Sequence, residues 1–92
     1  MNLETFKTEL KNWVGRNKMG KAIHQLDAEL HEDSAVMDDF VLFRNQYNDL
    51  QDQEEFDLIS AENLQVAKSK QVKRFLYLVN KLEAEDLKKS NM

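Results

Sequence analysis

The sequence predicts an all-α fold, a compact antiparallel four-helix bundle with helices at about residues 3–14, 19–31, 35–54 and 60–87. Three observations lead to this prediction. Proline is absent and only two glycines occur in 92 residues, so helix breakers are nearly missing. Apolar residues recur three and four positions apart in four segments, which is the period of an amphipathic helix. The links between the segments are short and show no strand-like alternation, so the helices are expected to pack antiparallel.

The first two helices each carry one apolar stripe. In the first, at about 3–14, the stripe is Leu3, Phe6, Leu10, Trp13 and Val14. Asn2 is placed to cap its start, and Gly15 to close its end in the left-handed conformation. In the second, at about 19–31, the stripe is Met19, Ala22, Ile23, Leu26 and Leu30. Glu32-Asp33-Ser34 is the next break, with Asp33 or Ser34 as the cap of the third helix.

The third helix, at about 35–54, has the clearest pattern. Its apolar residues are spaced four, three, four and three positions apart, which keeps one seam facing a partner helix: Val36, Phe40, Phe43, Tyr47 and Leu50. The fourth helix, at about 60–87, starts at the cap Ser60, with Ile59 and Leu64 placed to form a hydrophobic staple. Its stripe is Leu64, Val72, Phe75, Val79 and Leu82.

The link between the third and fourth helices, Glu55 to Ile59, carries three apolar side chains and no glycine. We therefore expect it to fold onto the end of the bundle. Residues 1–92 are expected to form a single protein-interaction domain, with residues 88–92 as a frayed tail.

Composition excludes several classes of protein. Hydrophobic residues make up 41% of the chain and charged residues 33%, which is too apolar for a disordered segment. No apolar run approaches the roughly 20 residues of a membrane span, and the N-terminus lacks a signal-peptide pattern. Cysteine is absent, which suits the cytoplasm. The net charge of −4 disfavours nucleic-acid binding, because phosphate neutralisation requires clustered cations.

No pattern in the sequence indicates catalysis, a cofactor or a metal ion. His24 and His31 are seven residues apart, about 10 Å along a helix, which is too far to share one ion. The acidic stretch 49–57 has no glycine for the sharp turn of a calcium loop. No serine lies in a glycine-rich elbow, and no glycine-rich loop can hold a phosphate. We expect a protein that is not an enzyme and uses no cofactor.

Charge is segregated along the chain. Residues 27–62 contain twelve acids and one base, Arg44, whereas residues 63–82 contain five bases and no acid. In the fourth helix, one face opposite the apolar stripe gathers cations around a tyrosine: Lys70, Lys73, Arg74, Tyr77 and Lys81. This composition is typical of a protein interface, but a solvated basic face gives the same pattern. Lys68 lies within the apolar stripe, and its ammonium is expected to reach the edge of the bundle.

The third helix also has a side turned away from its seam: Asp38, Val41, Leu42, Asn45, Asp49 and Asp52. Val41 and Leu42 are either a small exposed apolar patch with an acidic rim, hence a partner site, or part of a wide stripe that touches two neighbouring helices. The opposite charges of the third and fourth helices can pair within one molecule. They can also pair between copies in a head-to-tail assembly, which the outward direction of the basic face slightly favours.

Several short motifs resemble those of a family of small bacterial modules, the effector-associated domains, in particular their eleventh type. The third helix ends in Tyr47-Asn48-Asp49-Leu50, and the following link ends in Ile59-Ser60-Ala61-Glu62. A long helix follows with apolar residues at the family's offsets: Leu64, Val66, Phe75, Leu76, Leu78 and Val79. The segment from Leu10 to Leu30 is similar to the family's opening, with Ala22-Ile23-His24-Gln25-Leu26 in the second helix.

The chain departs from the family at two places. The family often carries Asn-Gly in the link, where this chain has Phe56-Asp57. It often carries Asn-Arg-Ile in the middle of the fourth helix, where this chain has Ser69-Lys70-Gln71.

The resemblance implies a non-catalytic adaptor of bacterial conflict and antiphage systems. Such modules join proteases, nucleotide-binding switch proteins or other effectors by contacts between matching domains. We therefore expect a partner that carries a matching domain, or self-association, and neither a nucleic acid nor a membrane. The alternative is an acidic helical inhibitor or antitoxin whose residues 27–62 cover a basic surface of its partner.

Overall fold

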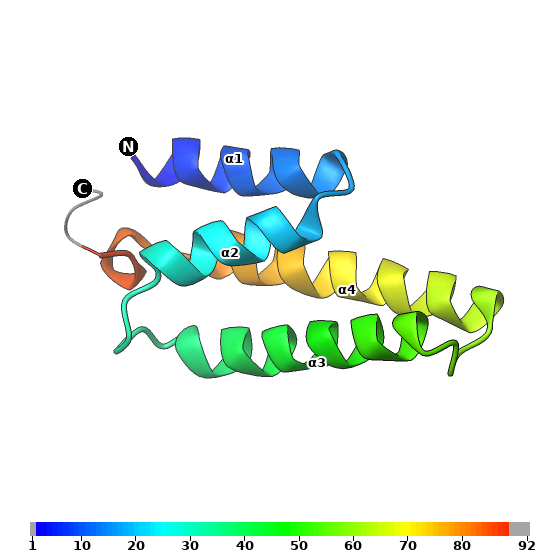
Figure 1. Ribbon diagram of the computed structural model, residues 1–92. Coiled ribbons are helices and arrows are strands. Elements are labelled where there is room, and N and C mark those ends of the chain that lie inside the picture. The colour runs from blue at the N-terminus through cyan, green and yellow to red at the C-terminus, as the bar shows by residue number, and fades with distance from the viewer. Residues whose placement is uncertain (1, 89–92) are drawn as a thin grey trace.

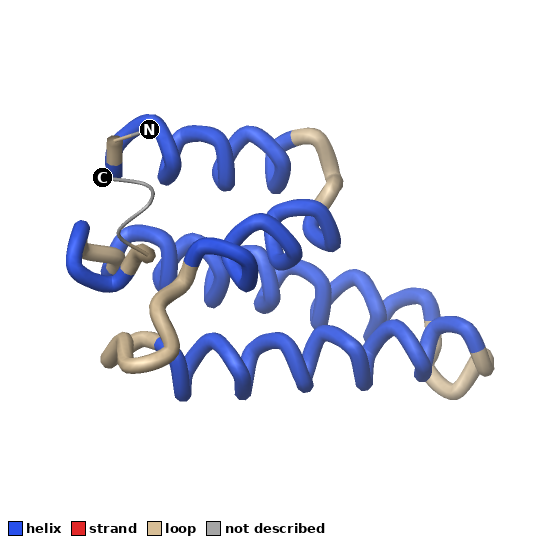
Figure 2. The backbone as a smooth tube through the Cα atoms, turned by 60° about the vertical axis from the view of Figure 1, so that its left-hand side comes forward, coloured by secondary structure: helices blue, strands red, loops and turns tan. Residues whose placement is uncertain are grey.

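The computed structural model describes residues 2–88 and confirms the all-α prediction. Four helices run in alternating directions and pack as a four-helix bundle (Figure 1): α1 (Leu3–Gly15), α2 (Met19–Glu29), α3 (Met37–Glu55) and α4 (Ala61–Lys81). A short 3₁₀ helix, η1 (Ala84–Asp86), follows α4. The molecule measures 43 × 24 × 17 Å, because the α3–α4 hairpin extends well past α1 and α2 (Figures 1 and 2).

The core lies where all four helices meet, and we call this part the packed end. Val72 of the predicted fourth stripe is 36% exposed, and Leu78 and Leu87, which are outside the predicted stripes, are buried. The other buried apolar residues belong to the predicted stripes: Phe6, Leu10, Ala22, Ile23, Leu26, Leu30, Val36, Phe40, Phe43, Phe75, Val79 and Leu82. The rings of Phe43 and Phe75 join α3 to α4 with centroids 5.4 Å apart. The side chains of Trp13, Gln25 and Glu9 tie α1 to α2, since Trp13 Nε1 donates to Gln25 Oε1 at 2.8 Å and Gln25 Nε2 donates to Glu9 Oε2 at 2.8 Å.

The outer part of the hairpin differs from the packed end. We call residues 52–67 the arm: the end of α3, the turn and the first part of α4. None of these sixteen residues is buried. The expectation that the link folds onto the bundle is wrong for Phe56 and Leu58, which are 66% and 74% exposed. At this distance from α1 and α2 there is no bundle end for the link to cover (Figure 1).

The fourth helix is shorter than the predicted 60–87. It ends at Lys81, and Leu82 is already extended, with φ −61° and ψ 136°. The chain then returns to the end of α2, where Leu87 forms an antiparallel bridge with Leu30. The backbone of Asp86 accepts from His31 N at 2.7 Å, and Lys88 N donates to Glu29 O at 2.9 Å. The sequence after Lys81 contains no proline or glycine that would end the helix. The early end of α4 therefore depends on these contacts with the end of α2. Lys88 of the predicted frayed tail is thus hydrogen-bonded, and residues 89–92 lie outside the described part.

Two of the predicted helix caps are confirmed. Asn2 accepts from Thr5 N at 2.7 Å and Ser60 accepts from Asn63 N at 3.2 Å. The prediction for Gly15 is wrong, because Gly15 is helical and the left-handed residue of the α1–α2 corner is Asn17, with φ 59°. Asparagine tolerates this region better than most residues.

The junction of α2 and α3 also differs from the prediction. The second helix ends at Glu29, and α3 begins at Met37 with Val36 as its cap residue and no capping side chain. Ser34 is instead used between segments. Its hydroxyl donates to Asp86 Oδ1 at 2.7 Å and accepts from Val36 N at 3.0 Å.

Candidate interaction surface

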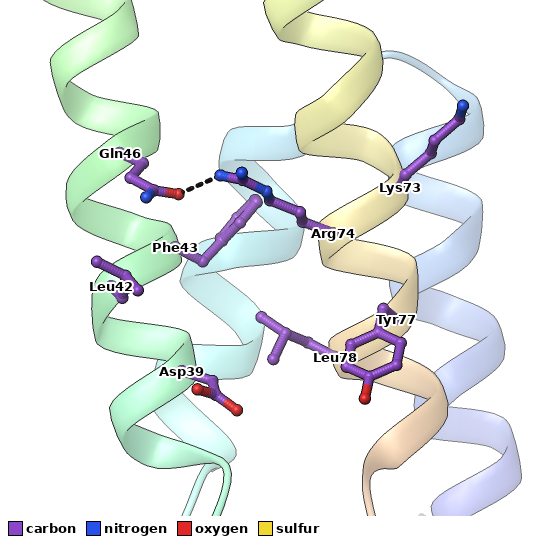
Figure 3. Close-up of a pocket in the computed structure, with 8 residues that line it drawn as sticks. All are labelled: Asp39, Leu42, Phe43, Gln46, Lys73, Arg74, Tyr77 and Leu78. Atoms are coloured by element: carbon purple, nitrogen blue, oxygen red, sulfur yellow. Dashed lines mark hydrogen bonds between the residues drawn. The ribbon is translucent and has the colours of Figure 1, made fainter.

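A concave feature of the surface lies between α3 and α4, on the side turned away from α1 and α2 (Figure 3). It is a hollow of about 450 Å³ whose floor is formed by the buried side chains of Phe43 and Leu78. Leu42 from α3 and Tyr77 from α4 form its walls and are 57% and 64% exposed. The hollow thus presents an apolar surface to solvent between α3 and α4.

Polar contacts cross this hollow at both ends. Arg74 Nη1 donates to Gln46 Oε1 at 2.6 Å and spans from α4 to α3 (Figure 3). At the other end, Lys81 Nζ donates to Asp39 Oδ2 at 3.1 Å and lies 5.3 Å from the centre of the Tyr77 ring. The hydrogen bond to Asp39 raises the pKa of Lys81 above its ordinary value. The cations at both ends of the hollow are therefore oriented by partners on α3.

A second hollow, of about 280 Å³, continues the first toward the arm. Both hollows share Gln46 and Arg74, and Asp49 and Lys70 line the second one. The two hollows lie end to end between α3 and α4, with the Arg74–Gln46 hydrogen bond between them. Together we call them the α3/α4 groove.

The structure brings six of the predicted interaction residues to this groove. Leu42, Lys73, Arg74 and Tyr77 line the first hollow, and Asp49 and Lys70 line the second. Lys81 lies beside Tyr77. In Figure 3 the Lys73 side chain extends away from α3. Most of the surface predicted on α4 and part of the surface predicted on α3 thus meet at the groove.

Besides Lys81, three predicted residues line neither hollow: Asp38, Val41 and Asp52. Asp38 and Asp52 are exposed and Val41 is half-buried, so of the predicted apolar pair only Leu42 is fully presented to solvent. Asp39 and Gln46 were missed by sequence reasoning. Each lies three or four residues from Leu42 and Phe43, which places it on the same side of α3 as those residues. That spacing was the signal that could have found them.

Part of the segregated charge is paired within the molecule. Lys68 and Lys81 on α4 form ion pairs with Glu54 and Asp39 on α3, at 3.3 and 3.1 Å. Lys68 is exposed, as expected for an ammonium that reaches the edge. Among residues 2–88, Lys70, Lys73 and the arm acids Asp52 and Glu55 form no ion pair. Unpaired charge of opposite sign therefore remains on the groove and on the arm.

The side chains considered for other chemistry are dispersed. His24 is exposed on α2, whereas His31 lies beyond the end of that helix and its Nδ1 accepts from Asp33 N at 3.0 Å. Within residues 2–88, no three His, Cys, Asp or Glu side chains gather in a way that could hold a metal ion. No helix in the same range combines the length and the apolar character that crossing a bilayer requires.

The described part of the chain is thus a four-helix bundle with an exposed groove between α3 and α4. Comparison with protein families gives the class: residues 5–83 match effector-associated domain 11. The match covers most of the chain, which therefore belongs to this family. Membership implies association with effector proteins. No curated protein and no solved structure matches the chain.

Proposed function

We propose that this domain is a non-catalytic adaptor that recruits or assembles effectors of a bacterial conflict or antiphage defence system. It does so by binding a matching domain on another protein or on a second copy of itself. The partner is a protease, a nucleotide-binding switch protein or another effector that carries an effector-associated domain. Family membership supports the association with effectors. The α3/α4 groove is the observation that gives this association a place on the molecule.

The groove suits a protein partner because of its composition. Exposed Leu42 and Tyr77 supply apolar and aromatic contact area, and interfaces are enriched in tyrosine and arginine. Lys70 and Lys73 add positive charge that no described residue neutralises in an ion pair. Charges at the rim of an interface accelerate encounter and select a partner of opposite charge.

Charge reversal on the groove tests the proposal. The chain is assayed for binding against itself and against separately produced effector-associated domains fused to proteases or to nucleotide-binding switch proteins. We expect at least one of them to bind. The Lys70→Glu/Lys73→Glu variant should then bind about tenfold more weakly or worse, because a like-charge contact at an interface costs several kcal/mol.

The control carries the same change in net charge on another part of the surface. Lys11 and Lys18 are exposed, on α1 and at the α1–α2 corner, so Lys11→Glu/Lys18→Glu should bind like the wild type. Both variants should keep the wild-type melting temperature. Absence of binding to every domain of the set contradicts the proposal, and equal weakening by both variants removes the groove from it.

A further inference from the structure

We propose that the groove of one molecule receives the α3–α4 turn of a second copy of this chain. Phe56 and Leu58 of the turn are the inserted side chains. This proposal rests on the proposed function and names the surface that the partner uses. Because the tip of one copy contacts the groove of the next, the assembly is head-to-tail.

The turn presents two large apolar side chains at the far end of the arm. Phe56 and Leu58 are the two most exposed of the large hydrophobic residues in the described chain, at 66% and 74%. Only Asp57 separates them, and it holds the left-handed conformation with φ 58°. Solitary exposed apolar residues are common on protein surfaces, but two at one projecting tip form a contact point.

The backbone holds this tip in one shape. Phe56 N donates to Asp52 O at 2.9 Å, and Leu58 N donates to Gln53 O at 2.8 Å. Asp57 N donates to Glu54 O at 3.2 Å. A turn that is hydrogen-bonded before it binds loses little conformational freedom on docking, which favours affinity.

The first hollow of the groove has the polarity and the volume to receive an apolar side chain. It measures about 450 Å³ and has the apolar floor and walls that an aromatic side chain requires. Its volume falls within the range of about 300–1,000 Å³ that is usual for pockets that bury small ligands.

The charges of the two surfaces are complementary. The arm carries five acids and no base: Asp52, Glu54, Glu55, Asp57 and Glu62. The α4 positions at the groove carry four bases and no acid: Lys70, Lys73 and Arg74 line it, and Lys81 lies beside Tyr77. Only Glu54 of the arm acids forms an ion pair within the described molecule, and of these four bases only Lys81 does. The remaining charges of opposite sign favour a contact between copies.

The occupant must come from another molecule. The tip and the groove belong to the same hairpin, the tip at its end and the groove along its side (Figures 1 and 3). The tip cannot reach its own groove without unfolding α3 and α4. Because the contact uses a different surface of each copy, every added molecule still offers one free tip and one free groove. Such heterologous contacts close into rings or continue as open chains.

The test uses two variants that each remove one side of the contact. The tip variant is Phe56→Ser/Leu58→Ser, and the groove variant is Leu42→Asp/Tyr77→Glu. All four side chains are exposed, so circular dichroism should show wild-type folding for both. By sedimentation velocity over a concentration series, the wild type should form growing assemblies, and each variant alone should stay monomeric.

Mixing the two variants gives the decisive reading. The tip variant keeps an intact groove and the groove variant keeps an intact tip, so an equimolar mixture should form a one-to-one dimer that cannot grow. Val66→Ser is the matched control, since Val66 is 52% exposed on α4 and lines neither hollow, and it should assemble like the wild type. Should the groove variant fold poorly, Lys73→Glu replaces it and should raise the apparent dissociation constant about tenfold.

The outcomes separate this inference from the proposed function. A wild type that stays monomeric at every concentration overturns the tip-in-groove contact between copies, and so does a tip variant that still assembles. If the same protein binds a matching domain of an effector, the adaptor function stands without self-assembly. If it binds neither itself nor any such domain, both proposals fail.

Discussion

The packed end and the arm are built from the same two helices, yet they are stabilised in different ways. In the packed end, α3 and α4 share fourteen buried apolar residues with α1, α2 and the segment after α4. Each fully buried large side chain contributes about 1.5–3 kcal/mol. In the arm, residues 52–67, no side chain is buried, and the helices are held by local contacts such as the Ser60 cap and the exposed Lys68–Glu54 pair.

This difference shows that a helix can be regular along its whole length while only part of it buries apolar side chains in the core. Regions with few buried apolar contacts open at lower free energy than the core does. Packing also constrains fewer residues in the arm, where only Gln53, Ile59, Leu64 and Ala67 are half-buried and the others are exposed. The exposed apolar and acidic residues of the arm are therefore available for a contact outside the molecule, which is the use that we propose for them.

The largest expected effect on stability comes from a comparison of phenylalanine-to-alanine substitutions in the two regions. Phe75 is fully buried and packs against Phe43, so Phe75→Ala should lower the free energy of unfolding by about 3–5 kcal/mol. Phe56→Ala in the arm should change it by less than about 0.5 kcal/mol. Urea denaturation of dilute protein, followed by circular dichroism, measures both. A comparable loss for the two variants means that the arm belongs to the core and that the comparison is wrong.

A smaller effect is expected at the junction that closes the packed end. Asp86 is the one buried polar residue of the described chain and accepts from the Ser34 hydroxyl at 2.7 Å and from Glu83 N at 2.8 Å. Asp86→Ala leaves both donors without this acceptor, which should cost about 1–3 kcal/mol. The exposed neighbour Glu85 provides the control, and Glu85→Ala should be neutral in the same denaturation experiment. Neutrality of Asp86→Ala would mean that water replaces the carboxylate there.

Local periodicity was sufficient to predict the packed end. The four-three-four-three spacing of α3 placed Val36, Phe40, Phe43 and Leu50 inside, and all four are buried. The period of the fourth helix likewise identified Phe75, Val79 and Leu82, whereas Leu64 and Val72 of the same predicted stripe are half-buried and 36% exposed. These predictions succeed because a side chain's direction on a helix depends only on its position along the chain.

The end of α4 was beyond local reasoning, because it depends on pairing between Leu30 and Leu87. The arm, in contrast, had a signal that was not used. At 1.5 Å per residue, α3 is about 28 Å long and α2 about 16 Å, so a hairpin of long helices must extend past its shorter neighbours.

The candidate site could be predicted only in part. The α4 side of the groove follows from helical period, because Lys70, Lys73, Arg74 and Tyr77 lie on one face. Helical spacing could place Asp39 and Gln46 beside Leu42, but that they pair with Lys81 and Arg74 depends on how the two helices are rotated against each other.

The smallest change in stability is expected at the two non-glycine residues with positive φ in the described chain. One lies in each region: Asn17 at 59° and Asp57 at 58°. For most L-residues this conformation costs roughly 1–2 kcal/mol, whereas glycine adopts it freely but loses about 0.5–1 kcal/mol of chain entropy on folding. Asp57→Gly should therefore stabilise the turn by a few tenths to about 1 kcal/mol, the more so because it removes an acid from the negative end of α3. Asn17→Gly should gain less, since asparagine already tolerates the conformation.

The stability gained from Asp57→Gly can appear in hydrogen exchange of the arm or in the urea midpoint of the whole domain. Which of the two changes shows whether the arm opens by itself or unfolds with the core. If the arm opens by itself, hydrogen exchange at the Leu58 amide, which is bonded to Gln53 O, should slow while the urea midpoint stays unchanged. If the urea midpoint rises by the full gain and exchange in the arm matches that of the core, the two regions unfold as one unit. The division into a packed end and an independent arm would then hold for burial but not for stability.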